Sequence, residues 1–174
     1  PQIVAQAKER NVKEASIGTN ASWGSNFLGE FSVDTLMTML EKQHHLWDEA
    51  GIKVTKCSLG DPMSWCMPHK VEESIYRTKE KWPDINYFWI HLHNGRNMAM
   101  PSAYAALRTL GPEDTVEFDG TIGGIGGCPY CGNGRATGQP PTEDLMHMLE
   151  DMGIDTEVDM DKLIDCVWMC EEIL

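Results

Sequence analysis

Apolar residues recur at two spacings along the chain, and stretches of the two kinds alternate. Short apolar runs of the kind that form buried strands cover residues 12–18, 52–61, 86–94 and 115–120. The stretches between and after them repeat apolar residues every three or four positions, which is typical of amphipathic helices. We expect a short helix around residues 3–7 and longer ones over residues 33–50, 68–82, 97–110, 142–152 and 160–173.

Residues at the ends of these segments support the predicted boundaries. Ser32 and Thr142 can each cap the first turn of the helix that follows them, and Gly51 can end the helix before it. Four apolar residues of the helix that follows Thr142 are expected to face inward: Leu145, Met148, Leu149 and Met152.

Strand and helix alternate four times, which predicts a parallel sheet. The polar candidates all fall at the carboxyl end of a predicted strand, where the active sites of parallel α/β folds lie. They are Asn20, Asp61, His91, His93, Asn94 and Asp119. A closed barrel needs eight strands, so four predict either half of a (β/α)₈ barrel or a small open sheet.

The strongest chemical signal is the pair His91 and His93 at the end of the third strand. Side chains two apart on a strand point to the same face, so the two imidazoles can hold a divalent metal. The alternative is that they only form hydrogen bonds at the strand end. A later glycine-rich loop, which includes Gly126 and Gly127, lets a ligand approach the main chain and favours a site.

Composition narrows the classes of partner. The net charge of −13 argues against nucleic acid or an anionic membrane, and no apolar run is long enough to span a bilayer. The opening PQIVAQAKERNV reads as the middle of a longer protein rather than a signal peptide. Six cysteines in an otherwise ordinary composition favour a reducing, cytosol-like compartment, with the mitochondrial matrix as the alternative.

Several motifs together resemble one family. SLGD, IHLH, FDGTIGGIGGCPY and TEDLMHMLEDMGI occur in this order. They resemble the C-terminal half of the hydroxymethylglutaryl-CoA lyases, TIM-barrel metallolyases whose group also contains isopropylmalate, homocitrate and citramalate synthases. The resemblance implies that residues 1–174 form one partial barrel domain, with strands five to eight and the C-terminal helices.

The resemblance also implies roles for individual residues. His91 and His93 would bind the cation, Mg²⁺ or Mn²⁺ rather than Zn²⁺, Cys128 would be a catalytic acid/base, and Asp61 would be an acidic catalytic residue. A further metal ligand falls on Gln139 by position or on Asn133 by chemistry. We expect the substrate to contact Gly126, Gly127 and Asn20.

By resemblance, the reaction is a metal-dependent retro-Claisen cleavage of a 3-hydroxy-3-methylacyl-CoA to acetyl-CoA and a keto acid. Asn94 follows the second histidine where the lyases have Asp, which favours the alternative of a condensing synthase. The Arg-Asp pair of the family's first strand has no equivalent here. We therefore expect a longer protein, or alternatively a homodimer or partner chain that supplies the missing half barrel.

Two readings come from other classes. Cys128-Pro-Tyr-Cys131 is the active-site motif of glutaredoxins and would make the protein a thiol–disulfide oxidoreductase, although the following GNGRATGQPP does not continue as a helix. The chain could also be a non-catalytic partner subunit. A zinc site formed by these two cysteines with Cys57 and Cys66 is weaker, and we expect the latter pair to be buried as small apolar residues.

Overall fold

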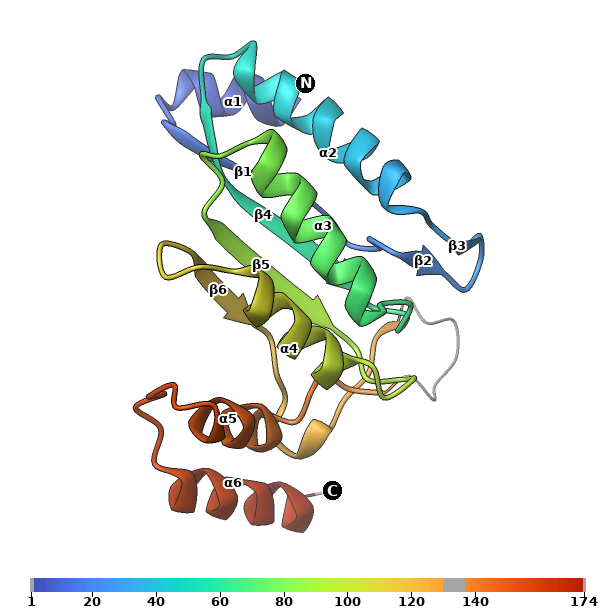
Figure 1. Cartoon of the computed structure of the whole chain (residues 1–174), viewed down its shortest axis with the longest axis vertical. Helices are drawn as coiled ribbons and strands as arrows, with labels where there is room; N and C mark the ends of the chain where they lie inside the picture. Colours follow the sequence, from blue (N-terminus) through green and yellow to red (C-terminus); the bar gives the residue numbers. More distant parts are fainter. Residues whose placement is uncertain (1, 130–136, 174) are drawn as a thin grey trace.

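A computed structural model describes residues 2–129 and 137–173 of the chain, and Figure 1 shows their arrangement. Its elements follow the predicted alternation of strand and helix. They are α1 (Gln2–Glu9), β1 (Glu14–Thr19), β2 (Gly24–Ser25), β3 (Gly29–Glu30), α2 (Val33–Asp48), β4 (Lys53–Asp61), α3 (Pro68–Lys81), β5 (Tyr87–Leu92), α4 (Ala99–Thr109), β6 (Thr115–Phe118), the 3₁₀ turn η1 (Ile122–Gly124), α5 (Thr142–Asp151) and α6 (Met160–Ile173).

The main sheet has four parallel strands in the order β1-β4-β5-β6, so each strand that begins a βα unit lies beside the next one along the chain. This confirms the predicted parallel α/β arrangement. The register places Gly60 of β4 beside His91 of β5, and Trp89 beside Glu117 of β6. The carboxyl ends of all four strands therefore meet at one edge, where the polar candidates were expected.

Helices α2, α3 and α4 cover one face of the sheet (Figure 1). The apolar core lies between the sheet and these helices. Every second side chain of β5 points into it, and Phe88, Ile90 and Leu92 are at most 1% exposed. The intervening Tyr87, Trp89 and His91 lie on the other face, where Lys56 stacks over the Tyr87 ring at 4.4 Å. That face is polar, unlike the helix-covered one.

Two predicted helix boundaries have different outcomes. The Ser32 side chain accepts a hydrogen bond from the backbone N–H of Thr35 and caps α2, as expected. The prediction that Thr142 caps α5 is wrong, because Thr142 is the first helical residue, Pro141 occupies the cap position, and no side chain there accepts a capping hydrogen bond. Met152, expected to face inward, is 41% exposed because it follows the last turn of α5.

The loop after β1 contains structure that the sequence pattern did not indicate. Strands β2 and β3 pair as a small antiparallel hairpin. Trp23, just before it, is fully buried, and its indole N–H donates to Ser74 Oγ at 3.1 Å. None of the helices in the described parts of the chain has the length and apolar character that a membrane crossing requires.

Candidate functional site

The end of β5 brings the two histidines together. Ile90 and Leu92 point into the core, so His91 and the following His93 are turned to the opposite face of the sheet. Their ring centroids are 5.2 Å apart, with the ring planes inclined by 56°. His93 is only 4% exposed, whereas the His91 side chain is 34% exposed. The predicted convergence of the two imidazoles is therefore present.

Both imidazoles are held by their Nδ1 atoms. His91 Nδ1 lies 2.6 Å from Asp119 Oδ2, and His93 Nδ1 lies 2.8 Å from the carbonyl oxygen of Thr137. A carboxylate and a carbonyl only accept, so each Nδ1 carries the proton and donates it. The Nε2 atom of each neutral ring then keeps a lone pair. This is the arrangement of metal-binding histidines, whose second nitrogen donates to a carboxylate or carbonyl.

Asp119 and Gln139 complete the surroundings of His91. Asp119 Oδ2 also accepts from the indole N–H of Trp89 at 2.9 Å, so the carboxylate is fixed from two sides. The side-chain amide of Gln139 lies 2.9 Å from His91 Nδ1 and 3.5 Å from its Nε2. The contacting atom is the amide nitrogen, and because His91 Nδ1 already carries a proton, two donors would face each other there. Rotation of the amide resolves this by exchanging nitrogen and oxygen, which places an oxygen beside the ring.

Two neighbouring cavities share His91 and Cys128. The first has a volume of about 270 Å³ and contains most of the predicted site residues; its lining includes His91, His93, Gly126, Gly127, Cys128 and Gln139. The second, of about 290 Å³, is lined by Asn20, Trp89, His91, Asp119 and Cys128, among others. The predicted thiol, imidazoles and glycines therefore surround the same space, and Asn20 lies next to it.

Asp61 has a different position. It is fully buried, lies outside both cavities, and accepts the backbone N–H groups of Trp65 and Cys66 at 2.8 and 2.7 Å. Burial raises the pKa of the Asp61 carboxyl, although these two hydrogen bonds and the nearby His93 act in the opposite direction. Its contacts brace the turn after β4, so the geometry supports a positioning role for Asp61.

Thr137 and Gly138 contact His93 and Asn94 just after the end of β5, and the sequence pattern did not indicate these contacts. The Gly138 carbonyl accepts the N–H of Asn94 at 3.0 Å, next to the Thr137 contact with His93. A Cβ atom on Gly138 would lie 2.3 Å from the carbonyl oxygen of Gly124 and 2.4 Å from that of Ile125. Glycine is therefore required where these two backbone segments meet.

The remaining candidates are cysteines and Asn133. Asn133 and Cys131 lie outside the described residues. Cys57 and Cys66 are buried as expected, and burial raises the pKa of the Cys57 thiol to about 12. Within residues 2–129 and 137–173, no three His, Cys, Asp or Glu side chains gather as a metal-binding group. The described residues therefore supply a histidine pair and an amide, which is part of a coordination shell.

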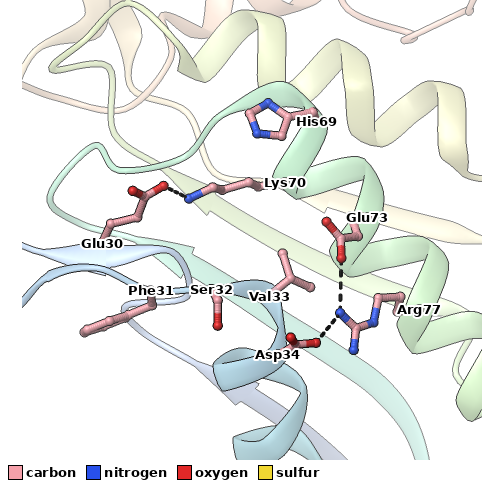
Figure 2. A pocket seen from close by; sticks show the side chains of 9 residues that line it. All are labelled: Glu30, Phe31, Ser32, Val33, Asp34, His69, Lys70, Glu73 and Arg77. Carbon is pink, nitrogen blue, oxygen red and sulfur yellow. Dashed lines mark hydrogen bonds and ion pairs between the residues drawn. The ribbon is translucent and has the colours of Figure 1, made fainter.

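A larger cavity, of about 480 Å³, lies between the starts of α2 and α3 (Figure 2). Its charged side chains pair with one another. Lys70 binds Glu30, and Arg77 lies 2.8 Å from Asp34 and 3.1 Å from Glu73. Because these charges already have partners, the cavity offers weaker evidence for a ligand than the histidine site.

Comparisons with known proteins agree with this geometry. A sequence model of the HMGL-like family matches residues 2–169. The chain is 30% identical over 162 residues to hydroxymethylglutaryl-CoA lyase YngG of Bacillus subtilis, a match that covers 93% of this chain and 51% of that protein. It is 30% identical over 148 residues to (R)-citramalyl-CoA lyase of Chloroflexus aurantiacus, covering 85% and 43%. The chain thus spans about half the length of each relative.

Solved structures show the same relation. The crystal structure of the Bacillus subtilis HMG-CoA lyase matches with a TM-score of 0.71 at 29% identity, over 98% of this chain and 53% of that one. The HMG-CoA lyase from Brucella melitensis gives a TM-score of 0.71 at 20% identity, which shows the common fold. The four parallel βα units thus correspond to about half of a lyase barrel. This chain belongs to the HMGL-like family.

Proposed function

We propose that this chain carries half of the active site of a divalent-metal-dependent acyl-CoA carbon–carbon lyase, of the hydroxymethylglutaryl-CoA lyase type. The observation that carries the proposal is the cavity shared by His91, His93 and Cys128. Paired imidazoles with free Nε2 atoms suit a cation, and a thiol in the same cavity suits proton transfer. The two relatives, named as lyases of hydroxymethylglutaryl-CoA and of (R)-citramalyl-CoA, support the reaction class.

The residues present fit a divalent cation in part. His91 and His93 would bind it through Nε2, with Gln139 as an oxygen ligand, and Asp119 would orient His91 from behind. A hard cation such as Mg²⁺ or Mn²⁺ takes further oxygen ligands, which the substrate and the other half of the barrel would supply. When bound, the cation would stabilise negative charge on the substrate oxygens during cleavage.

Cys128 would handle the proton in the reaction. A general base accepts the proton of the substrate's tertiary hydroxyl group. The oxygen then forms the carbonyl group of the keto acid while the adjacent C–C bond breaks, and the electron pair of that bond leaves with the thioester enolate. The Cys128 thiol donates its proton to the enolate carbon, which becomes the methyl group of acetyl-CoA, and the protonated base returns its proton to the thiolate. The glycines beside Cys128 let the thiol approach the substrate.

The condensing synthase alternative rested on Asn94. In the structure, Asn94 Oδ1 accepts the N–H of Ala99 at 3.3 Å, at the first residue of α4. An aspartate at this position would accept the same hydrogen bond, so either side chain can stabilise the start of α4. Asn94 therefore gives no preference for the synthase, and the lyase is the better supported function.

Two assays on the native protein test the proposal. The first compares cleavage of 3-hydroxy-3-methylglutaryl-CoA with condensation of acetyl-CoA and a 2-oxo acid, each with added Mn²⁺. The second repeats the cleavage with Cys128→Ser, for which we expect a loss of kcat of at least about 100-fold, with Cys166→Ser on exposed α6 as control. Undiminished turnover by Cys128→Ser would refute the proton-transfer role.

A further inference from the structure

One cation at this edge of the sheet, Arg96, forms no ion pair with an acidic side chain in the part of the chain that the structure describes. Arg96 is exposed and follows His93 by three residues, in the turn between β5 and α4. Its guanidinium lies 4.2 Å from the centroid of the Trp65 ring. Among the described residues no carboxylate forms an ion pair with it, in contrast to Lys70, Arg77 and Lys79.

The Trp65 residue that lies against Arg96 is held by hydrogen bonds from its side chain and from its backbone. The Trp65 indole N–H donates to Asn26 Oδ1 at 3.0 Å, and its backbone N–H donates to Asp61 Oδ1 at 2.8 Å. A planar guanidinium stacked on a held aromatic ring keeps its N–H groups free at the edge. Such an arginine is pre-organised to bind anionic oxygens, since less side-chain entropy is lost on binding.

The turn that carries Arg96 is tied to the histidine site. The Gly95 N–H donates to Ser64 Oγ at 2.7 Å, and a Cβ on Gly95 would lie 3.3 Å from Thr137 Oγ1. Thr137 in turn accepts the proton of His93 Nδ1 through its carbonyl group. Arg96 therefore lies on the turn that directly follows the histidine pair, next to the site, although it does not line either of the two cavities.

Glu30, on the β3 strand, is the acidic side chain on which the charge of Arg96 acts. The hydrogen bond from Lys70 lowers the pKa of Glu30, and the charges of Lys70, His69 and Arg96 lower it further. Lys70 already engages this carboxylate (Figure 2 shows the pair), so Glu30 does not form an ion pair with Arg96.

We propose that Arg96, stacked on Trp65, binds an anionic group of the substrate next to the histidine site. The inference rests on the proposed function for the identity of the substrate. Two parts of an acyl-CoA supply the required chemistry: the free carboxylate of the acyl chain and the phosphates of the coenzyme. Both present oxygens that a guanidinium can bind in a bidentate manner.

The test compares Arg96→Gln with Arg108→Gln in the native protein. Arg108 is also exposed and lies over an aromatic ring, Tyr104, but in the last turn of α4, away from the strand ends. For 3-hydroxy-3-methylglutaryl-CoA we expect Arg96→Gln to raise KM by about 10-fold or more with a much smaller change in kcat. Arg108→Gln should leave both constants unchanged.

A truncated substrate separates the two anionic groups. With the pantetheine thioester, which lacks the phosphates of the coenzyme, the KM effect of Arg96→Gln disappears if Arg96 binds phosphate and persists if it binds the acyl carboxylate. Calorimetric titration of coenzyme A and of free 3-hydroxy-3-methylglutarate measures the same contact without turnover. Arg96→Gln should weaken binding of one of them by about 10-fold.

The outcomes distinguish this inference from the proposed function. Binding that depends on Arg96, without cleavage of any hydroxyacyl-CoA, would support the anion site and refute the lyase proposal. Cleavage by the native protein with KM and both binding constants unchanged in Arg96→Gln would overturn the anion site alone. Loss of binding in Arg108→Gln to the same extent would also overturn it, because the effect would then be one of general charge.

Discussion

His91 Nδ1 donates a hydrogen bond to Asp119 Oδ2 over 2.6 Å, and this contact fixes which nitrogen of the ring faces the cavity. Asp119 directly follows the end of β6, the strand next to β5, so the ends of two adjacent strands position the histidine and the carboxylate that holds it. The indole of Trp89 on β5 holds the same carboxylate oxygen. The ring orientation therefore depends on residues in or directly after the sheet strands.

Replacing Asp119 should weaken metal binding without removing it. In Asp119→Asn the amide no longer enforces the Nδ1–H tautomer, and we expect the affinity for Mn²⁺ to fall by about 10- to 100-fold. Isothermal titration measures the change. Glu117→Gln, which removes a charge from β6 two residues earlier, is the control. An equal loss in both variants would show that only net charge matters.

Gly138→Ala should destabilise the fold. The added methyl group would meet two backbone carbonyl oxygens at 2.3 and 2.4 Å, and backbone atoms cannot move aside cheaply. We expect the free energy of unfolding to fall by about 3 kcal/mol. Gly153→Ala is the control, because Gly153 has a φ of 80° with open space around it and should cost only about 1 kcal/mol. Urea denaturation measures the free energy of unfolding of both variants. A similar decrease in both would argue against the steric contact at Gly138.

The buried Asp61 predicts a specific pH dependence. Burial raises its pKa in the folded state above the unfolded value. The folded state therefore holds its proton more tightly, and the contribution to stability is complete at low pH and declines as pH rises above about 4. Asn cannot titrate, so the stability of the wild type relative to Asp61→Asn should decrease from pH 4 towards pH 7. Denaturation across this range measures the difference, and a difference that grows with pH would contradict the assignment.

Thiol reactivity should separate the buried cysteines from Cys128. Burial raises the pKa of the Cys57 thiol to about 12 and also raises that of Cys66. Both thiols therefore stay protonated and shielded from solvent near neutral pH. Cys128 lines two cavities and should react with iodoacetamide in the native protein. Mass spectrometry of labelled peptides distinguishes them. Labelling of Cys57 before Cys128 would contradict this prediction and would show that the core around Cys57 opens readily.

Local pattern predicted the parts of this fold that depend on periodicity. Alternating apolar residues located β5 and its two faces, and the Ser32 cap located the start of α2. The histidine pair followed from the same alternation, because side chains two apart share a face. Motif resemblance added Cys128 to their surroundings.

Contacts between distant segments could not be predicted in this way. Thr137 accepts a hydrogen bond from His93, 44 residues away in the sequence, and the ring of Trp65 lies against Arg96, 31 residues away. No local sequence pattern indicates either contact. Thr142 does not cap α5 because the helix already begins at Thr142, where the backbone N–H pairs with the carbonyl of Thr121, a partner that only the folded chain brings near. The family resemblance predicts an acidic catalytic residue at Asp61, and the fold adds that both its oxygens accept backbone N–H groups, a contact that no local pattern indicates.

The central claim is that His91 and His93 bind a divalent cation through their Nε2 atoms. The most direct measurement is the amount of Mn²⁺ bound by the native protein and by His91→Ala, with His147→Ala on the exposed side of α5 as the control. We predict stoichiometric Mn²⁺ in the native protein and in His147→Ala, and its loss in His91→Ala. Stoichiometric Mn²⁺ retained by His91→Ala with unchanged affinity would contradict the claim.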